Sequence, residues 1–317
     1  MTILANDSIS AITVSMLEKK GFTVLTTTVA QEQLAKYIND NNVSILIVAR
    51  TTKVGKELIE QCPHLKAIAS SGVALDTIDV SHAKKKGIQI LNTPKATSYA
   101  VAELAFAHLL SGSRFLYDAN RNMPLEGDSQ FKELKKGYSG GKELKGKTLG
   151  VFGFGSIGQE IAKIAIGFGM QVVYTDSQIP KATIALSFFD QQKVNFTLES
   201  KTKEEVLKAA DYISMHVPAQ KEYTINKADF TLMKPGVGIV NTATGSVVDE
   251  VALIEALDSG KVSFAGLDVF ESEPKPEIKI LMHPNISLSP NIGSSTLEAQ
   301  NRIGTEIATQ IIELFNQ

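Results

Sequence analysis

Residues 147–176 read KTLGVFGFGSIGQEIAKIAIGFGMQVVYTD and carry the strongest indication of architecture in the chain. An uncharged apolar run of strand length, residues 148–152, leads into the G-x-G-x-x-G motif of residues 153–158. A segment of helical period follows, and a second apolar run, residues 171–175, ends on Asp176. A motif of this kind that follows a strand, opens a helix and precedes an acidic residue by about 20 positions predicts a dinucleotide-binding βαβ unit.

Each part of the motif has a physical role. Gly153 permits the tight turn, Gly155 lets the backbone approach a pyrophosphate, and Gly158 lets the helix pack closely on the strand. The start of the helix offers free N–H donors and a positive dipole to the phosphates. Asp176 suits the two ribose hydroxyls of NAD and would repel the additional phosphate of NADP. The alternative is a βαβ unit whose glycines serve packing alone. The predicted contacts with NAD in this segment are Gly153, Gly155, Ser156, Ile157, Gly158 and Asp176.

The composition is that of an ordinary globular protein. With 317 residues, 43% of them apolar and 21% charged, the chain is long enough for two domains. A net charge of −2 gives no reason to expect nucleic acid, and no apolar run is long enough to span a membrane. Cys62 is the only cysteine, which predicts a reducing cytoplasm and no disulfide framework. No His/Asp/Glu cluster has the spacing of metal ligands, so no metal is expected.

Short apolar runs alternate with helical segments in the first third of the chain. Strands are predicted at residues 2–5, 22–25, 45–48, 65–69 and 87–91, with helices at residues 8–20, at residues 31–39 and between the last two strands. The run at residues 45–48 is apolar throughout, which is typical of a parallel strand buried on both faces. This rhythm predicts an α/β fold with a doubly wound parallel sheet.

The rest of the chain has the same alternation with one exception. A helix is predicted at residues 99–110, a further helical stretch at 114–120 and a surface loop at 122–128. Alternating apolar residues at 179–198, around a turn at 190–192, predict an inserted β-hairpin. The other predicted elements are helices at 202–210 (with a capping box from Thr202), 228–233, 250–257 and 295–315, and strands at 212–216, 237–241, 264–268 and 286–288.

Several further motifs resemble those of the D-2-hydroxyacid dehydrogenases. They are G-x-E-L-x-G-K-T-L-G at 141–150, Asp211 followed by H-V-P at 216–218, M-K-x-G at 233–236, V-D-E-x-A-L at 248–253 and G-L-D-V-F-E-x-E-P at 266–274. N-T-P at 92–94 and V-A-E at 101–103 look like the D-3-phosphoglycerate dehydrogenase branch, in a short form without a regulatory tail. The resemblance covers essentially the whole chain.

The resemblance implies two doubly wound parallel-sheet domains, with a Rossmann-type cofactor domain inserted into a flavodoxin-like substrate domain. The substrate domain would comprise residues 1–97 plus 290–317, and the NAD-binding domain residues 98–289 with the dimerisation helices. The resemblance also implies an active site in the cleft between the domains and a homodimer built on the helices after Pro94.

The resemblance implies that three residues carry out the reaction. An Arg binds the substrate carboxylate and polarises the carbonyl, a His takes or gives the hydroxyl proton, and a Glu holds that His. Glu273 matches the Glu, whereas the Arg position is Thr244 and the His position is Asn291. Asp268 matches the family's partner for the nicotinamide amide. The remaining predicted cofactor contacts, together with Asp268, are His216, Val217, Pro218 and Thr242.

The substrate loop departs from the family pattern as well. Ser70 stands where the branch has an Arg that would contact a substrate phosphate. A second Arg of the branch aligns with Ala49, with the adjacent Arg50 as a possible replacement. Lys95, which follows Pro94, is a candidate to restore a cation. The predicted substrate loop comprises Ser70, Ser71, Gly72 and Lys95.

Three functions remain open. Neither Asn nor Thr accepts a proton at neutral pH, and loss of a general base costs about 10²–10⁴-fold in rate, so we expect an NAD-binding protein with weak or no standard dehydrogenase activity, such as a sensor. The alternative is an NAD-dependent oxidoreductase that acts on a different 2-hydroxy acid, or on a neutral or cationic substrate, with a replacement acid–base group such as Glu273. The third is the family reaction running slowly. Glu273 is expected to lack its partner and to make the site more negative, which disfavours D-3-phosphoglycerate.

Overall fold

The structure is a computed structural model, and it describes residues 1–49, 51–71, 75 and 77–315. The chain folds as two units, one formed by Met1–Ser98 with Ser294–Gln317 and the other by Tyr99–Gly293. Two predicted positions of the substrate region, Arg50 and Gly72, lie outside the described residues.

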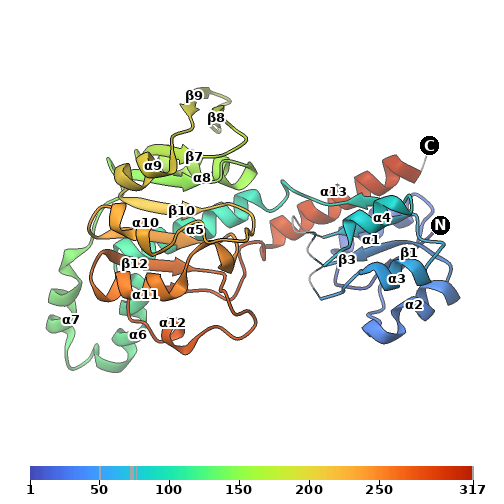
Figure 1. Ribbon diagram of the computed structural model, residues 1–317, viewed down its shortest axis with the longest axis horizontal. Coiled ribbons are helices and arrows are strands. Elements are labelled where there is room, and N and C mark those ends of the chain that lie inside the picture. The colour runs from blue at the N-terminus through green and yellow to red at the C-terminus, as the bar shows by residue number, and fades with distance from the viewer. Residues whose placement is uncertain (50, 72–74, 76, 316–317) are drawn as a thin grey trace. The chain divides into compact units, whose positions relative to one another are not determined.

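The first unit is built on a five-stranded sheet in the order β2-β1-β3-β4-β5, with every neighbouring pair parallel (Figure 1). β3 is the central strand, and its residues 45–48 are fully buried, which explains their continuous apolarity. This strand order is that of a flavodoxin-like doubly wound sheet, as predicted. The strands are β1 (Thr2–Ala5), β2 (Thr23–Leu25), β3 (Val43–Val48), β4 (Ala67–Ser70) and β5 (Gln89–Leu91).

The last helix of the chain completes the first unit. Ile303, Ile307 and Ile311 of this helix, α13, are buried in one cluster with apolar residues of β1, β3 and β4. A Cβ at Gly304 would lie 2.1 Å from Thr13 Oγ1, so α13 and α1 approach too closely for a side chain there. The helices of this unit are α1 (Ala11–Glu18), α2 (Gln31–Asp40), α3 (Lys56–Gln61), α4 (Val80–Lys85) and α13 (Leu297–Phe315).

The second unit is built on a parallel six-stranded sheet in the order β13-β12-β11-β10-β6-β7. β6 has β7 on one side and β10 on the other, so the direction of winding reverses between β6 and β10, where such sheets bind ligands. The predicted fold class is confirmed. The strands of this sheet are β6 (Thr148–Phe152), β7 (Gln171–Thr175), β10 (Tyr212–Met215), β11 (Val237–Asn241), β12 (Val262–Leu267) and β13 (Ile286–Leu288).

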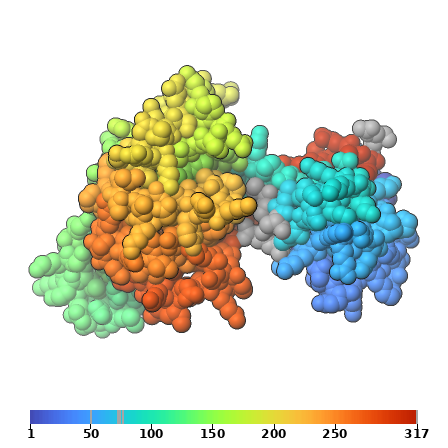
Figure 2. All heavy atoms as spheres, in the orientation of Figure 1, coloured from blue at the N-terminus to red at the C-terminus, as the bar shows by residue number. Residues whose placement is uncertain are grey.

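The predicted β-hairpin is confirmed. β8 (Lys181–Ser187) and β9 (Lys193–Glu199) pair antiparallel, and Ile184 anchors them because it is buried in the core that also contains Tyr174. The hairpin projects from the surface of the second unit (Figure 2). The helices of this unit are α5 (Ser98–Ser113), α6 (Leu116–Glu126), α7 (Phe131–Gly137), α8 (Ser156–Gly167), α9 (Lys203–Ala209), α10 (Lys227–Leu232), α11 (Glu250–Asp258) and α12 (Ile278–Leu281), with short 3₁₀ turns at Tyr138–Gly140 and Gly245–Val247.

The surface loop predicted at residues 122–128 is wrong. Helix α6 continues through Pro124 to Glu126, although proline in a helix interior removes a backbone hydrogen bond. The Asn122 side-chain amide donates to Asp118 at 3.1 Å and to the Tyr138 hydroxyl at 2.9 Å, and that hydroxyl donates to Asp118 at 2.8 Å. Two of these three bonds join α6 to Tyr138, which lies just beyond α7, and such a tertiary contact outweighs the local signal of one proline. Helix α3 was not predicted either.

In the described part of the chain, no helix is both long and apolar enough to cross a lipid bilayer. Among the same residues, no group of three or more His, Cys, Asp or Glu side chains is placed to hold a metal ion.

Candidate cofactor and reaction site

The turn between β6 and α8 is shaped by its glycines. Gly153 has φ of +87°, and a Cβ there would lie 2.5 Å from the His216 carbonyl oxygen. A Cβ at Gly158 would lie 2.1 Å from the Gly153 carbonyl oxygen, so the turn and the helix touch directly. Gly155 differs, because a Cβ there would meet no atom of the described residues within 4 Å apart from its chain neighbours. Packing therefore explains two of the glycines but not Gly155, whose open surface at the start of α8 fits the approach of a pyrophosphate.

Asp176 is fixed beside this turn. Its Oδ2 accepts a hydrogen bond from the backbone N–H of Phe154 at 2.6 Å, and its Oδ1 accepts from the N–H groups of Gln178 and Ile179 at 2.8 and 2.9 Å. Its own N–H donates to Ser200 Oγ at 3.0 Å, which ties the base of the hairpin to the same point. An ionised carboxylate has about four lone-pair directions, so the side chain keeps acceptor capacity for a ribose hydroxyl.

The other predicted cofactor residues lie at the carboxyl ends of neighbouring strands. His216 follows β10 and Thr242 follows β11, one position beyond the register pair of Met215 with Asn241. Thr242 is 7% exposed, and its Oγ1 has no hydrogen-bond partner among the described residues; the same is true of His216 Nδ1. Buried polar atoms are nearly always hydrogen-bonded, so two orphaned atoms at the edge next to the β6–α8 turn fit a bound polar molecule. Val217 continues this edge half-buried and Pro218 exposed, and Ser156 and Ile157 at the start of α8 are half-buried.

His216→Gln is expected to flatten the pH dependence of unfolding. Burial lowers the pKa of His216 to about 3, so the folded chain keeps the ring neutral while the unfolded chain binds a proton below about pH 6.5. The free energy of unfolding therefore falls on acidification from about pH 6.5 toward pH 3, by at most about 1.4 kcal/mol per pH unit for this group. Denaturant unfolding between roughly pH 7.5 and 5 measures this slope. The control is His64→Gln, at an exposed position, and equal slopes for wild type and His216→Gln would contradict the prediction.

Asp268 is enclosed by donors from its own unit. The side chain is 2% exposed, and it accepts hydrogen bonds from Ser289 Oγ at 2.6 Å, from the N–H of Ile292 at 2.9 Å and from the N–H of Gly293 at 2.8 Å. Its carbonyl oxygen accepts from the N–H of Asn291 at 2.7 Å. Asp268 therefore organises the chain segment that follows β13.

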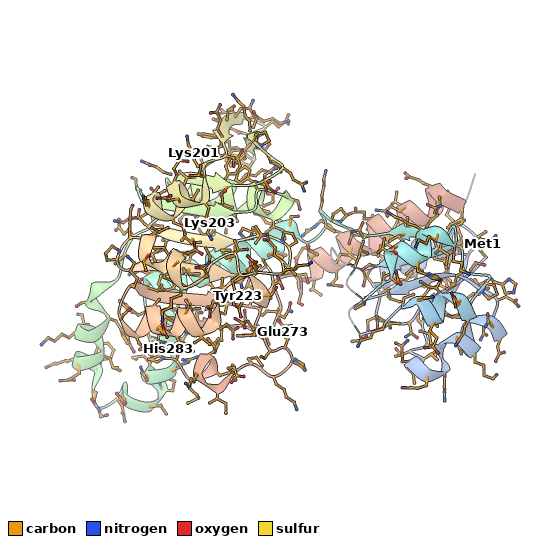
Figure 3. The ribbon with its side chains drawn as sticks, viewed as in Figure 1. Met1, Lys201, Lys203, Tyr223, Glu273 and His283 are labelled. Atoms are coloured by element: carbon orange, nitrogen blue, oxygen red, sulfur yellow. The ribbon has the colours of Figure 1, made fainter. Side chains whose placement is uncertain are left out.

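Glu273 has a partner, contrary to the prediction. Asn291 Nδ2 donates to Glu273 Oε2 at 2.9 Å, and the N–H of Phe270 donates to Oε1 at 3.1 Å. Asn291 has φ of +55°, a left-handed conformation that Asn tolerates better than most residues. Glu273 is exposed, in the loop between β12 and α12 (Figure 3), and is not desolvated in a low-dielectric site as the sequence suggested. Both donors are neutral, so the negative charge of the carboxylate is not balanced.

Thr244 lies in the same part of the second unit. It is half-buried, and its carbonyl oxygen accepts a hydrogen bond from Asn241 Nδ2 at 2.9 Å. A Cβ at the next residue, Gly245, would lie 2.0 Å from the carbonyl carbon of Phe270, whose N–H holds Glu273. The structure thus brings the three positions matched to the catalytic groups of the family into one region.

The surroundings of Glu273 are acidic. The N–H of Glu250 donates to Glu271 Oε1 at 2.8 Å, and the N–H of Glu271 donates to Glu250 Oε1 at 2.9 Å. Burial raises the pKa of Glu250, and the charges of Glu271 and Glu277 act in the same direction. The hydroxyl of Tyr223, a residue labelled in Figure 3, donates to Glu271 Oε2, and the two oxygens are 3.0 Å apart. No Lys, Arg or His of the described chain forms an ion pair with Glu271 or Glu273.

The predicted substrate loop lies in the first unit. Ser70 ends β4 and is buried, and the N–H and hydroxyl of Ser71 donate to the Val48 carbonyl oxygen at 2.8 and 3.2 Å. Lys95 is exposed and lines an open hollow of about 430 Å³ on the surface of α13. Arg302 adds a second cation to this hollow, held by a bond from its Nε to the Ala96 carbonyl oxygen at 2.9 Å. Sequence reasoning missed Arg302, because nothing in the helical pattern of residues 295–315 distinguishes it.

Comparison with known proteins agrees with this geometry. Residues 106–293 match the D-isomer specific 2-hydroxyacid dehydrogenase family, NAD binding domain. The chain is 41% identical over 303 residues to a hydroxypyruvate reductase of Thermotoga maritima, a match that covers 94% of this chain and 92% of that one. It is 38% identical to a D-3-phosphoglycerate dehydrogenase of Methanocaldococcus jannaschii, covering 98% of this chain but only 56% of that one.

The chain is also similar to a solved structure whose name gives a reaction other than the reduction of a keto acid. That structure is an acyclic imino acid reductase in complex with NADPH and D-Arg, with a TM-score of 0.81 and 26% identity, covering 100% of this chain and 98% of that one. The family match extends over more than half of the chain, and the relatives cover nearly all of it. The chain belongs to the D-isomer specific 2-hydroxyacid dehydrogenase family, and its cofactor is NAD.

Proposed function

We propose that this chain binds NAD(H) through the β6–α8 turn and Asp176, and that it turns over D-2-hydroxy acids or their keto acids weakly or not at all. The observation that carries the proposal is the hydrogen bond from Asn291 to Glu273, at the place where the family reaction needs a His. An amide keeps the contact with the carboxylate but has no proton to exchange at neutral pH.

The missing groups have a large combined effect. Loss of a positioned general acid–base group costs about 10²–10⁴-fold in rate. Thr244 cannot form the bidentate contact by which a guanidinium recognises a carboxylate. The unbalanced charge of Glu273 repels an anionic substrate. These three effects act together against the substrates named for the relatives, hydroxypyruvate and D-3-phosphoglycerate.

The test combines binding and turnover. We expect NADH fluorescence to report binding, and NADH oxidation with glyoxylate, hydroxypyruvate or pyruvate to stay below about 0.1 s⁻¹, against typical enzyme values of about 1–10³ s⁻¹. Rapid turnover of any of these keto acids would overturn the second half of the proposal. Failure of NADH to bind would overturn the first.

A second candidate function is reduction of a cationic carbon–nitrogen double bond. When bound, NADH supplies a hydride. A keto acid needs a proton at its carbonyl oxygen as it is reduced, whereas an iminium ion already carries its proton and its positive charge, and its nitrogen simply keeps the former π electron pair. Glu273, surrounded by neutral donors, is suited to attract such a cation. The similarity to an acyclic imino acid reductase supports this class of substrate.

Glu273→Gln tests this second candidate. The variant keeps the size of the side chain but removes its charge, so we expect about tenfold weaker binding of a cyclic ammonium ligand such as piperidinium, measured by calorimetry, and a similar loss in any reduction of the corresponding cyclic iminium. Glu277→Gln, an exposed position of the same loop, serves as the control. Equal affinity in wild type and Glu273→Gln would exclude a role for this carboxylate.

We further propose a homodimer that covers α6. This helix has no buried residue, and Leu116 and Leu125 are 54% and 76% exposed, although an isolated helix of this length is marginal in water. Leu125→Lys is expected to shift the mass measured by light scattering from dimer toward monomer, because it places a charge on that apolar surface. Val251→Lys, at an exposed apolar position of α11, is the control. A wild-type chain that is already monomeric would refute the proposal.

A further inference from the structure

His108 is a buried side chain of α5 with a partner at each ring nitrogen. It is 5% exposed, with Nδ1 2.9 Å from Ser287 Oγ and Nε2 2.9 Å from Ser289 Oγ. A Cβ at Gly266 of β12 would lie 2.5 Å from the Cβ of His108, so the helix sits directly against the strand. The ring is therefore held in a single position, between the sheet and the segment that follows β13.

The hydrogen bonds continue from His108 to the reaction site. Ser289 Oγ donates to Asp268 Oδ1, and Asp268 also accepts from the N–H groups of Ile292 and Gly293, with its carbonyl oxygen accepting from Asn291. All these bonds fall on residues 289–293, the segment that carries the Asn291 amide to Glu273. Movement of Asp268 would therefore move Asn291.

The direction of each proton follows from the chemistry of the groups. A carboxylate only accepts, so the single hydroxyl proton of Ser289 goes to Asp268. The Ser289 oxygen must then accept from His108, which requires the proton of the neutral ring to be on Nε2. Nδ1 is consequently an acceptor, and the hydroxyl of Ser287 donates to it. Burial lowers the pKa of His108, against the opposing charge of Asp268, and this favours the neutral ring.

We propose that His108 is a positioning residue: its neutral ring, protonated on Nε2, holds the Ser289 hydroxyl and the Asp268 carboxylate, and through them sets Asn291 against Glu273. The contacts stand by themselves, and only the significance of Asn291 and Glu273 rests on the proposed function.

Amide hydrogen exchange tests the mechanical part of this proposal. In His108→Leu we expect the exchange of the Ile292 and Gly293 amides to accelerate about fivefold or more, because their acceptor loses its support. Val262→Ala, a buried change in β12 outside this network, is the control for a general loss of stability. Ser289→Ala breaks the same chain of bonds without emptying the space of the imidazole, and it should accelerate the same two amides. If neither variant accelerates them more than Val262→Ala does, the proposal is wrong.

Two further measurements test the proposed hydrogen bond from His108 to Ser289: the tautomer of the ring, and the recovery of amide protection in a His108→Gln variant. Nitrogen NMR of the wild-type ring should show Nε2 protonated and Nδ1 unprotonated near neutral pH, a signature that mere filling of space does not require. His108→Gln, whose amide can donate to Ser289, should restore much of the protection lost in His108→Leu. An Nδ1–H tautomer, or no rescue by Gln, would overturn the assignment. Neither measurement needs NADH, so a chain that failed to bind NADH would refute the proposed function and leave these results unaffected.

Discussion

Thr244→Arg combined with Asn291→His is expected to raise NADH-dependent reduction of glyoxylate by about 10²–10⁴-fold over the wild-type chain. Glu273 is already in place as the partner of the new His. Asn291 Nδ2 lies 2.9 Å from Glu273 Oε2, so an imidazole at position 291 can form a hydrogen bond with the same carboxylate. The φ of +55° at position 291 is no obstacle, since His is enriched in the left-handed region along with Asn. The Arg restores a cation beside Glu273 and a planar donor for the substrate carboxylate.

The single variants are the matched controls for this gain. Asn291→His alone lacks a group to bind the anion, and Thr244→Arg alone lacks a proton donor, so we expect each to stay within about tenfold of wild type. Glyoxylate is the appropriate substrate because it carries no phosphate and does not need the Arg that Ser70 replaces. A double variant that binds NADH but is no faster than wild type would show that the site has diverged beyond these two positions.

Gly155→Ala is expected to weaken NADH binding by about 10- to 100-fold with little change in stability. Apart from its chain neighbours, a Cβ at this position meets no atom of the described residues within 4 Å, so the free protein has room for it. The same methyl group would occupy the surface at which the pyrophosphate approaches the start of α8. NADH fluorescence titration and thermal unfolding measure the two quantities separately.

Gly158→Ala and Gly167→Ala are the control variants for the effect of Gly155→Ala on NADH binding and on stability. A Cβ at Gly158 lies 2.1 Å from a backbone oxygen, which cannot move aside as a side chain can, so this variant should lose about 1–3 kcal/mol of unfolding free energy and NADH binding as well. Gly167, at the other end of α8, has open space around its Cβ and should change neither. If Gly155→Ala binds NADH as tightly as Gly167→Ala does, the turn is not the pyrophosphate site.

The architecture was largely predictable because its signals are local. β6, β7 and β11 follow the predicted residues directly, and the turn at Gly153–Gly158 could be placed because a strand, three glycines and a helix occur within a few residues. Prediction failed at α6, where the contact between Asn122 and Tyr138 supports a helix over residues that were predicted to form a surface loop. There the decisive contact comes from another segment, and no local pattern reveals it.

The same limit applies to the site. Sequence reasoning proposed Glu273, Thr244 and Asn291 as site positions, since each stands at a fixed place in a motif. It predicted a carboxylate without a partner, because the amide of Asn291 approaches Glu273 only after the chain has folded back from β13. The connection between His108 and Ser289 spans 181 residues of sequence and has no motif at all.

The position of α13 at the end of the chain also affects when the first unit can complete its fold during synthesis. The 195 residues of Tyr99–Gly293 separate the first five strands from the helix whose Ile303, Ile307 and Ile311 cover them. At about 5–20 residues per second, a ribosome needs roughly 10–40 s to make that insertion. For all of that time the face of the nascent sheet on which α13 packs is covered only in part, by Leu17 of α1 and its neighbours, and holdase chaperones can bind the apolar surface that is left. The first unit can therefore be completed only after all of the second unit has been synthesised.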